Sequence, residues 1–210
     1  VQELFRDLGV QQIVSGGQTM NPSTEDILHA AEQVPAMDVY VLPNNKNIVM
    51  AAEQAARLAR TSGVRRIHVV PTTTIPQGIS AMMAYDESAE IKDNVEAMQE
   101  TASRVQSGSV TFAARDSDYD GHQIKEGELL ALENGKVAFT GTDLGSVTAK
   151  VAKDLMREDS QFITLLYGAD VSEEQAADVE EAVRSLLPEE IELTVAYGGQ
   201  PVYYFLISVE

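Results

Sequence analysis

The chain has 210 residues, 44% of them hydrophobic, which is enough for one large domain or for two lobes of about 100 residues each. Fifteen Lys and Arg oppose 33 Asp and Glu, and the resulting formal charge of −18 argues against nucleic-acid binding. No apolar run approaches the roughly 20 residues of a membrane-spanning helix, and no signal-peptide pattern opens the sequence. The absence of cysteine excludes disulfides and thiolate-held zinc. Because the sequence starts at Val1 rather than Met, we interpret it as a piece of a longer cytoplasmic protein.

The first half of the chain alternates short apolar strands with amphipathic helices. Strands are predicted at residues 10–14, 38–42 and 66–70, and helices at 1–8, from 21 onward, 48–60, 77–85 and 88–106. Asn21 is the expected N-cap of the second helix, with Pro22 at its first helical position. Strand–helix alternation at this spacing predicts a parallel sheet flanked by helices.

The second half changes character near Gly108. Strands are predicted at residues 109–114, 129–132, 136–139, 162–166, 191–196 and 202–208, and helices at 143–156 and 172–187. Asn134-Gly135 predicts a hairpin, and Ser172 with Gln175 predicts a capping box. We therefore expect an α/β protein of two lobes, residues 1–107 and 108–210, the second with a mixed sheet.

Polar loops follow each of the first three predicted strands. The candidate partner- or ligand-binding residues are Ser15, Gly16, Gly17, Gln18 and Thr19 after the first, Asn44 and Asn45 after the second, and Thr72, Thr73 and Thr74 after the third. Ligands of open parallel sheets bind beyond the carboxyl ends of the strands, so these loops are expected to lie together. They hold no His, Asp or Glu, and Lys46 is their single cation, so no catalytic residue is predicted. Turns and helix caps are the alternative interpretation.

Three further patterns resemble a calcium loop, a phosphate-binding loop and a histidine metal site, but each lacks a feature that such a site requires. Residues 116–121 imitate the start of a calcium loop, but the twelfth position holds Gly127 instead of Glu, which indicates an acidic turn between strands. Residues 141–146 lack the Lys of a phosphate-binding loop and read as a helix start. The three histidines are scattered along the chain, and no metal site is predicted.

Negative charge gathers in the second half, where 20 acids oppose 7 bases. Eleven of these acids lie in residues 158–192, with Arg184 as the only base. A solvated helix face and a docking face for a basic partner both fit this pattern.

Four phrases of the sequence carry a family resemblance. They are residues 15–26, 42–47, 70–78 and 197–204, and they resemble the C-terminal region of the dihydroxyacetone-kinase-like proteins of Gram-positive bacteria, the catalytic subunits of fatty acid kinase. The resemblance runs from Val10 to Glu210. One departure is Thr73, where the family pattern leads us to expect Lys.

The resemblance implies a DegV-like fold and a role in fatty acid phosphorylation. In that family an N-terminal domain binds ATP and magnesium, and a separate DegV-type fatty-acid-binding protein presents the acyl carboxylate. The resemblance implies that this region docks that partner and is not catalytic alone, with the cofactors on domains outside it. Two alternatives stay open: a lipid- or small-ligand-binding domain, and a homodimerisation domain whose strand 202–209 lies at a sheet edge with Tyr203 and Tyr204.

Overall fold

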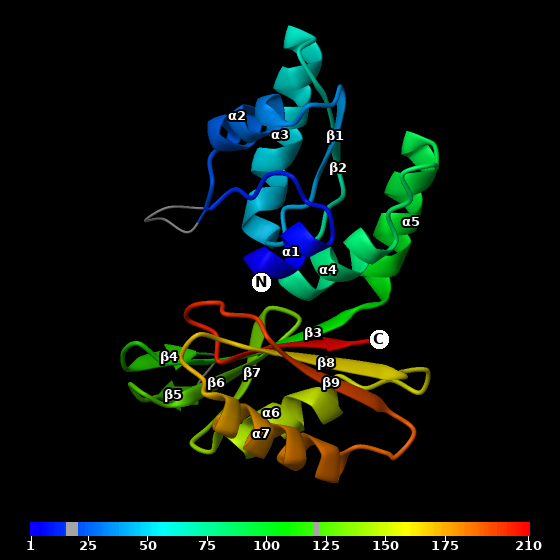
Figure 1. The fold of residues 1–210 in the computed structure, drawn as a ribbon. Coiled ribbons are helices and arrows are strands. Elements are labelled where there is room, and N and C mark those ends of the chain that lie inside the picture. Colours follow the sequence, from blue (N-terminus) through cyan, green and yellow to red (C-terminus); the bar gives the residue numbers. More distant parts are fainter. Residues whose placement is uncertain (16–20, 120–121) are drawn as a thin grey trace. The chain divides into compact units, whose positions relative to one another are not determined.

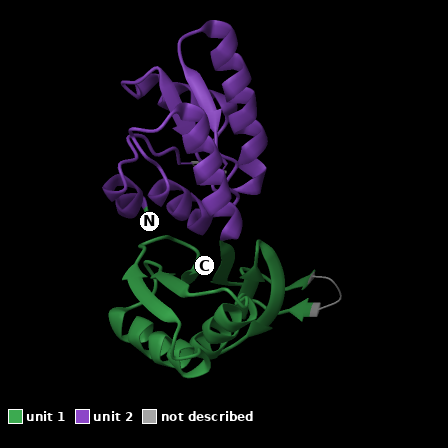
Figure 2. Ribbon diagram, turned by 90° about the vertical axis from the view of Figure 1, so that its right-hand side faces the viewer, with its two compact units in different colours: residues 1, 105–210 green, residues 2–104 purple. Residues whose placement is uncertain are grey.

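The computed structural model describes residues 1–15, 21–119 and 122–210. These divide into two compact units, which Figure 2 distinguishes by colour: unit 2 is residues 2–104, and unit 1 is residue 1 with residues 105–210. The sequence boundary between them falls after Arg104, just before the first strand of unit 1. The turn at Asp120 and Gly121, part of the imitated calcium loop, lies outside the described residues.

Unit 2 contains a two-stranded parallel sheet and five helices within its described residues (Figure 1). The helices are α1 (Gln2–Asp7), α2 (Thr24–Gln33), α3 (Lys46–Ser62), α4 (Ile75–Met83) and α5 (Ile91–Arg104), and the strands are β1 (Asp38–Val41) and β2 (Arg66–Val69). Val39 and Ile67 pack on one face of the sheet against α2 and α3. Tyr40, on the opposite face, packs in a second cluster with Ala81 of α4 and Met98 of α5. Alternation along each strand therefore places helices on both faces.

Two predictions for this unit are wrong. Residues 10–14 form no strand, because Val10 continues from α1 by donating to the carbonyl of Phe5 and the segment pairs with neither β1 nor β2. An apolar run can cover a core without joining a sheet, and periodicity alone does not separate the two. The N-cap of α2 is Ser23 rather than Asn21, since Ser23 and Asp26 satisfy each other's backbone N–H groups in a capping box.

Unit 1 contains a six-stranded mixed sheet in the order β7-β6-β3-β10-β8-β9. Its strands are β3 (Gln106–Phe112), β6 (Leu129–Glu133), β7 (Lys136–Gly141), β8 (Phe162–Tyr167), β9 (Glu192–Tyr197) and β10 (Phe205–Val209), and β4 (Ser117–Tyr119) pairs with β5 (His122–Ile124) in a separate hairpin. Only β8 and β9 are parallel, so the predicted mixed sheet is confirmed. Helices α6 (Leu144–Asp154) and α7 (Glu173–Leu186) cover one face of this sheet (Figure 1).

Local signals in unit 1 are confirmed where they concern neighbouring residues. Asn134 and Gly135 both have positive φ, as a two-residue hairpin turn requires, and they join β6 to β7. Ser172 and Gln175 form the predicted capping box of α7. Asp143 caps α6 by accepting from the backbone N–H of Ser146, as expected of a helix start.

The predicted edge strand at residues 202–209 is wrong. Strand β10 begins at Phe205 and lies in the middle of the sheet between β3 and β8. All five of its residues are buried, and the strand pairs with a neighbour on each side. Tyr203 and Tyr204 precede the strand and are half-buried. A dimer formed through β10 as a free edge is therefore excluded.

No helix within the described residues is both long enough and apolar enough to cross a membrane.

Candidate functional site

The ten candidate residues fall into three groups in the structure. Gly16, Gly17, Gln18 and Thr19 lie outside the described residues, and Ser15 is exposed. Asn44 and Asn45 follow β1, and the three threonines 72–74 follow β2. Because β1 and β2 are parallel, these two loops leave the sheet at the same edge, and the structure brings Asn44 and Thr72 into direct contact.

Asn44 and Thr72 lock the two loops together. The Thr72 hydroxyl donates to Asn44 Oδ1 at 2.7 Å, and the Asn44 backbone N–H donates to Thr72 Oγ1 at 3.1 Å. Asn44 has a φ of 55°, in the left-handed region that Asn tolerates better than most residues. A Cβ atom at Gly78 of α4 would lie 2.0 Å from Asn44 Oδ1, so glycine leaves the room that this side chain needs. Buried Thr72 and half-buried Asn44 thus hydrogen-bond to each other.

The other described candidates hold helix starts. Asn45 caps α3 by accepting from the N–H of Asn47 at 2.9 Å, and Thr74 caps α4 by accepting from the N–H of Gln77 at 3.3 Å. Thr73 donates from its backbone and its hydroxyl to Gln77 Oε1, at 2.8 and 2.9 Å. The two helices therefore begin at the loop edge of the sheet, and capping accounts for much of the polarity of these side chains.

Several side chains at this edge stay exposed. We define the loop-end surface as Lys46, Asn47, Met50 and Thr73, all of which are exposed. Met50 is 78% exposed on the second turn of α3. The surface therefore contains the cation of Lys46, polar groups of Asn47 and Thr73, and the flexible thioether of Met50. Such a set is suited to recognition, and it contains no His, Asp or Glu.

Sequence reasoning missed a charged cluster at the opposite edge of the sheet. Asp38 opens β1 and Arg66 opens β2, and the two are register partners. Arg66 Nε donates to Asp38 Oδ1 at 2.7 Å, and His68 Nε2 lies 2.9 Å from the same oxygen. Hydrogen bonds from Arg66 first, and then from His68, hold the pKa of the Asp38 carboxyl far below its usual range. The cluster pins the two strands together.

Aromatic rings continue this cluster. The ring centroids of Tyr40 and His68 are 5.7 Å apart, and Tyr85 packs edge-on against Tyr40 at 5.5 Å. Burial raises the pKa of the Tyr40 hydroxyl. The signal was present in the sequence, since polar residues 38, 40, 66 and 68 alternate with apolar ones on two strands of equal length. What the sequence did not provide was the register that pairs them.

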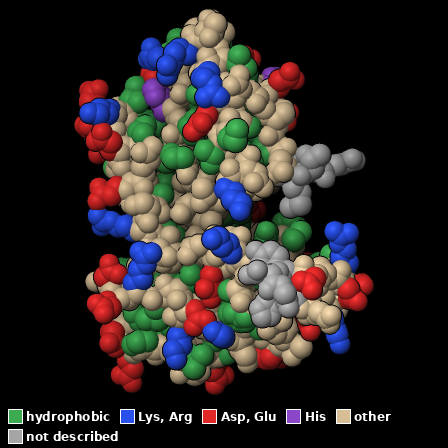
Figure 3. Space-filling model, turned by 180° about the vertical axis from the view of Figure 1, so that it is seen from behind, with side chains coloured by type: hydrophobic (Ala, Val, Ile, Leu, Met, Phe, Trp, Pro, Cys, Tyr) green, Lys and Arg blue, Asp and Glu red, His purple; other side chains and the backbone are tan. Residues whose placement is uncertain are grey.

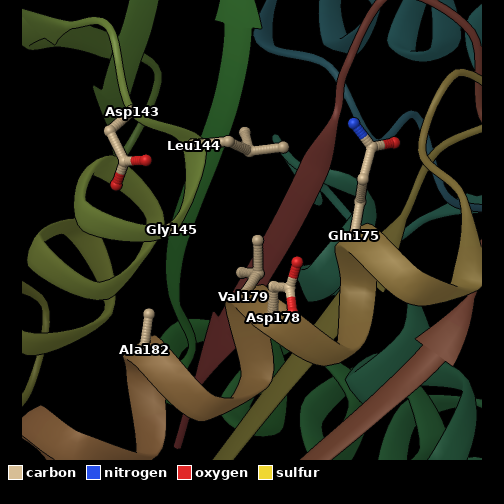
Figure 4. A pocket seen from close by; sticks show the side chains of 7 residues that line it. All are labelled: Asp143, Leu144, Gly145, Gln175, Asp178, Val179 and Ala182. Carbon is tan, nitrogen blue, oxygen red and sulfur yellow. The ribbon is translucent and has the colours of Figure 1, made fainter.

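A shallow groove separates α6 from α7 in unit 1 (Figure 4). Its volume is about 310 Å³, and Leu144 from the start of α6 and Val179 from α7 both line it. The carboxylates of Asp143 and Asp178 stand at its rim. The helices approach closely here, because a Cβ atom on Gly145 would lie 3.2 Å from that of Ala182. The groove is therefore lined by both apolar and acidic side chains.

No group of three or more His, Asp or Glu side chains that could hold a metal ion occurs within the described ranges. Asp116, which opens the calcium-like phrase, instead accepts a hydrogen bond from the backbone N–H of Glu126 at 2.7 Å.

Comparison with known proteins identifies the family of this sequence. The sequence model of the C-terminal region of FakA-like fatty acid kinase subunits matches residues 1–210. An uncharacterised protein of Staphylococcus haemolyticus is 42% identical over 210 residues, and the protein YloV of Bacillus subtilis is 40% identical over the same length. The matches cover 100% of this chain but 37% of each of those proteins.

Solved structures share the fold at low sequence identity. The dihydroxyacetone kinase of C. freundii, in complex with AMP-PNP and Mg²⁺, matches with a TM-score of 0.67 at 15% identity, covering 90% of this chain and 42% of that one. A DegV family protein of Corynebacterium glutamicum matches with a TM-score of 0.62 at 14% identity, covering 100% of this chain and 91% of that one. The Streptococcus pneumoniae fatty acid kinase B3 protein loaded with linoleic acid matches with a TM-score of 0.60 at 14% identity, covering 90% of this chain and 76% of that one. These matches confirm the DegV-like fold.

Proposed function

This chain belongs to the family of FakA-like fatty acid kinase C-terminal regions, and on that premise we propose that it docks a DegV-type fatty-acid-binding protein. Docking would place the partner's acyl carboxylate within reach of an ATP-binding domain elsewhere in the longer protein. The chain's contribution is then orientation, which lowers the entropic part of the barrier without supplying a reacting group.

The observation that carries this proposal is the loop-end surface. Lys46, Asn47 and Met50 lie in the first two turns of α3, and Thr73 directly follows Thr72. Because Asn44 and Thr72 fix the segments that lead into these positions, little ordering is required when a partner binds. Met50 supplies an apolar contact of the adaptable kind found in protein interfaces, and Lys46 and Asn47 supply polar contacts beside it.

The chemistry is assigned to the rest of the protein. The chain spans 37% of the length of its curated relatives, and ATP and magnesium are proposed to bind in the part that it does not cover. Transfer of a phosphoryl group requires positioned cations at the phosphates, and no cluster of three or more metal-binding side chains occurs among the described residues. A cytoplasmic location fits this role.

The test is calorimetric titration of the chain with the DegV-type protein of the same organism, with and without bound fatty acid. We expect saturable binding near one-to-one, and binding at least about tenfold weaker for Met50→Ser combined with Lys46→Ser, as for the loss of a central contact. Both positions are exposed and outside the Asn44–Thr72 lock, so folding should be retained.

Lys92→Ser combined with Met83→Ser is the matched control. It removes the same two residue types from exposed positions on α4 and α5 and should leave the affinity unchanged. Absence of binding by the unaltered chain would refute the docking role. Fatty acid released from the purified chain on denaturation, detected by mass spectrometry, would instead favour the alternative of a lipid-binding domain.

A further inference from the structure

The C-terminal end of α3 carries an exposed patch that differs in charge from the rest of the chain. Four of the 15 bases fall within residues 57–66, and Figure 3 shows Lys and Arg side chains gathered where α3 ends. We define the α3 end as Arg57, Leu58, Arg60 and Val64, all of them exposed. Its two apolar members are 44% and 45% exposed.

Within the described part of the chain, the two arginines of this patch make no ion pair. Arg57 donates twice to the neutral amide of Gln54, at 3.1 and 2.7 Å. A helix C-terminus favours cations, which accounts for Arg60 in the last turn of α3. That effect does not explain why Leu58 and Val64 are exposed beside the arginines, and this combination is typical of a protein-binding surface.

Unit 1 carries an acidic surface on α7, opposite in charge to the arginines of the α3 end. Glu174, Asp178 and Glu181 are exposed at helical spacing on one face of α7. The single base of this helix, Arg184, does not neutralise them, because its guanidinium donates to the backbone carbonyls of Ile191 and Leu193. Asp178 also stands at the rim of the groove between α6 and α7 (Figure 4).

We propose that the α3 end of one molecule docks in the α6–α7 groove of a second copy of the same chain. Leu58 would enter the space above Leu144 and Val179, while Arg57 and Arg60 would pair with carboxylates on the rim. Arginine forks bind carboxylates in this way, as Arg66 already does with Asp38 in this chain. This inference is independent of the proposed function.

The second copy is favoured over other anionic partners by the apolar side chains of its groove. A chain of net charge −18 is repelled by nucleic acid and by an anionic membrane over their whole surfaces. Salt screens the repulsion between two copies in the same way as the repulsion from these other surfaces. A second copy differs because it presents Asp178 beside the apolar side chains of Leu144 and Val179, where Leu58 can bind. The contact is head-to-tail, because the two patches differ.

The experiment is light scattering over a range of concentrations in about 0.1 M and about 1 M salt. The unaltered chain should exceed its monomer mass of 22.8 kDa as concentration rises in low salt, and should return to it in high salt. Arg57→Glu combined with Arg60→Glu should stay monomeric, and so should Asp178→Asn combined with Glu181→Gln. Mixing these two variants should give a complex of two chains and nothing larger, because each retains one intact patch.

Lys92→Glu combined with Arg104→Glu changes the net charge equally on α5 and should associate as the unaltered chain does. Leu58→Ser, an exposed substitution that folding should tolerate, should also weaken association. An unaltered chain that remains a monomer at every concentration would overturn the proposal. Association that survives loss of Arg57 and Arg60, or variants that fail to bind each other when mixed, would overturn it equally.

Discussion

Asn44 and Thr72 lie 28 positions apart in the sequence and exchange two hydrogen bonds in the structure. Thr72 Oγ1 accepts from the backbone N–H of Asn44 while its own proton goes to Asn44 Oδ1, so one hydroxyl serves as donor and acceptor. The Thr72 side chain is 1% exposed, which leaves water little access to replace either bond. The pair therefore sets the positions of the loops that follow β1 and β2.

Replacing Thr72 with Val should destabilise the chain by about 1–3 kcal/mol, because the shape is kept while two polar groups of Asn44 lose their partner. Urea unfolding followed by circular dichroism would measure the loss. Thr73→Val is the control, since Thr73 is exposed and its loss should change stability by no more than about 0.5 kcal/mol. Equal effects of the two substitutions would show that the lock contributes nothing.

Gly78→Ala should be destabilising through a clash rather than through a lost bond. The added methyl would lie 2.0 Å from Asn44 Oδ1 and 2.6 Å from Asn44 Cγ, so the Asn44 side chain would have to move. We expect a loss of about 1–3 kcal/mol. Asn44→Gly keeps the positive φ and removes the obstructing atoms, so Gly78→Ala should cost at least about 1 kcal/mol less in that background. Additive effects in this double-mutant cycle would contradict the close approach.

Local patterns accounted for much of this fold. The Asn134-Gly135 turn and the capping box at Ser172 each concern residues that are neighbours in sequence, and both appear as predicted. The two helices that follow β1 and β2 also begin beside the predicted loops. These features depend on backbone preferences that short segments carry by themselves.

Pairing between distant segments was harder to predict. Residues 10–14 and 202–209 were both predicted as strands from their apolar residues, yet the first forms no strand and the second contributes the central strand β10. The difference lies in their partners, because β10 pairs with β3 on one side and β8 on the other. A single sequence gives hydrophobic periodicity but not register.

In the candidate site too, local features could be predicted from the sequence and contacts between distant residues could not. Asn45 and Thr74 were open to interpretation as caps, which they are, since each accepts from a nearby backbone N–H. The bond between Asn44 and Thr72 required the parallel pairing of β1 and β2, as did the cluster of Asp38, Arg66 and His68. Both sites therefore depended on tertiary structure.

Arg65 is expected to stabilise the end of α2 through hydrogen bonds. Its NH2 group donates to the carbonyls of Glu32 at 3.0 Å and Val34 at 3.2 Å, groups that a helix end leaves without partners. Arg65→Lys keeps the charge but loses the planar fork, and should lower the free energy of unfolding by about 1–2 kcal/mol. Arg57→Lys, on an exposed helix position, is the control and should have little effect. A thermal melt that does not distinguish these two variants would argue against the capping role.

The charged cluster at Asp38 predicts a specific dependence of stability on pH. Because its pKa is lowered in the folded state, Asp38 stabilises the fold at pH values above the pKa of the unfolded carboxyl, about 3.9. That contribution is lost as the pH falls below about 4 toward the folded pKa. Asp38→Asn should be less stable than the unaltered chain at pH 7, and the difference should stay constant down to about pH 4 and shrink below it. Urea unfolding at intervals from about pH 7 to about pH 2.5 measures it.

Glu53→Gln serves as the matched control, because Glu53 is exposed in the middle of α3 and makes no ion pair within the described residues. It should follow the pH dependence of the unaltered chain closely. If Asp38→Asn also runs parallel to the unaltered chain at every pH, the carboxylate does not stabilise the pairing of β1 with β2. If the two curves converge only below about pH 4, the bonds from Arg66 and His68 stabilise the fold through the ionised form of Asp38.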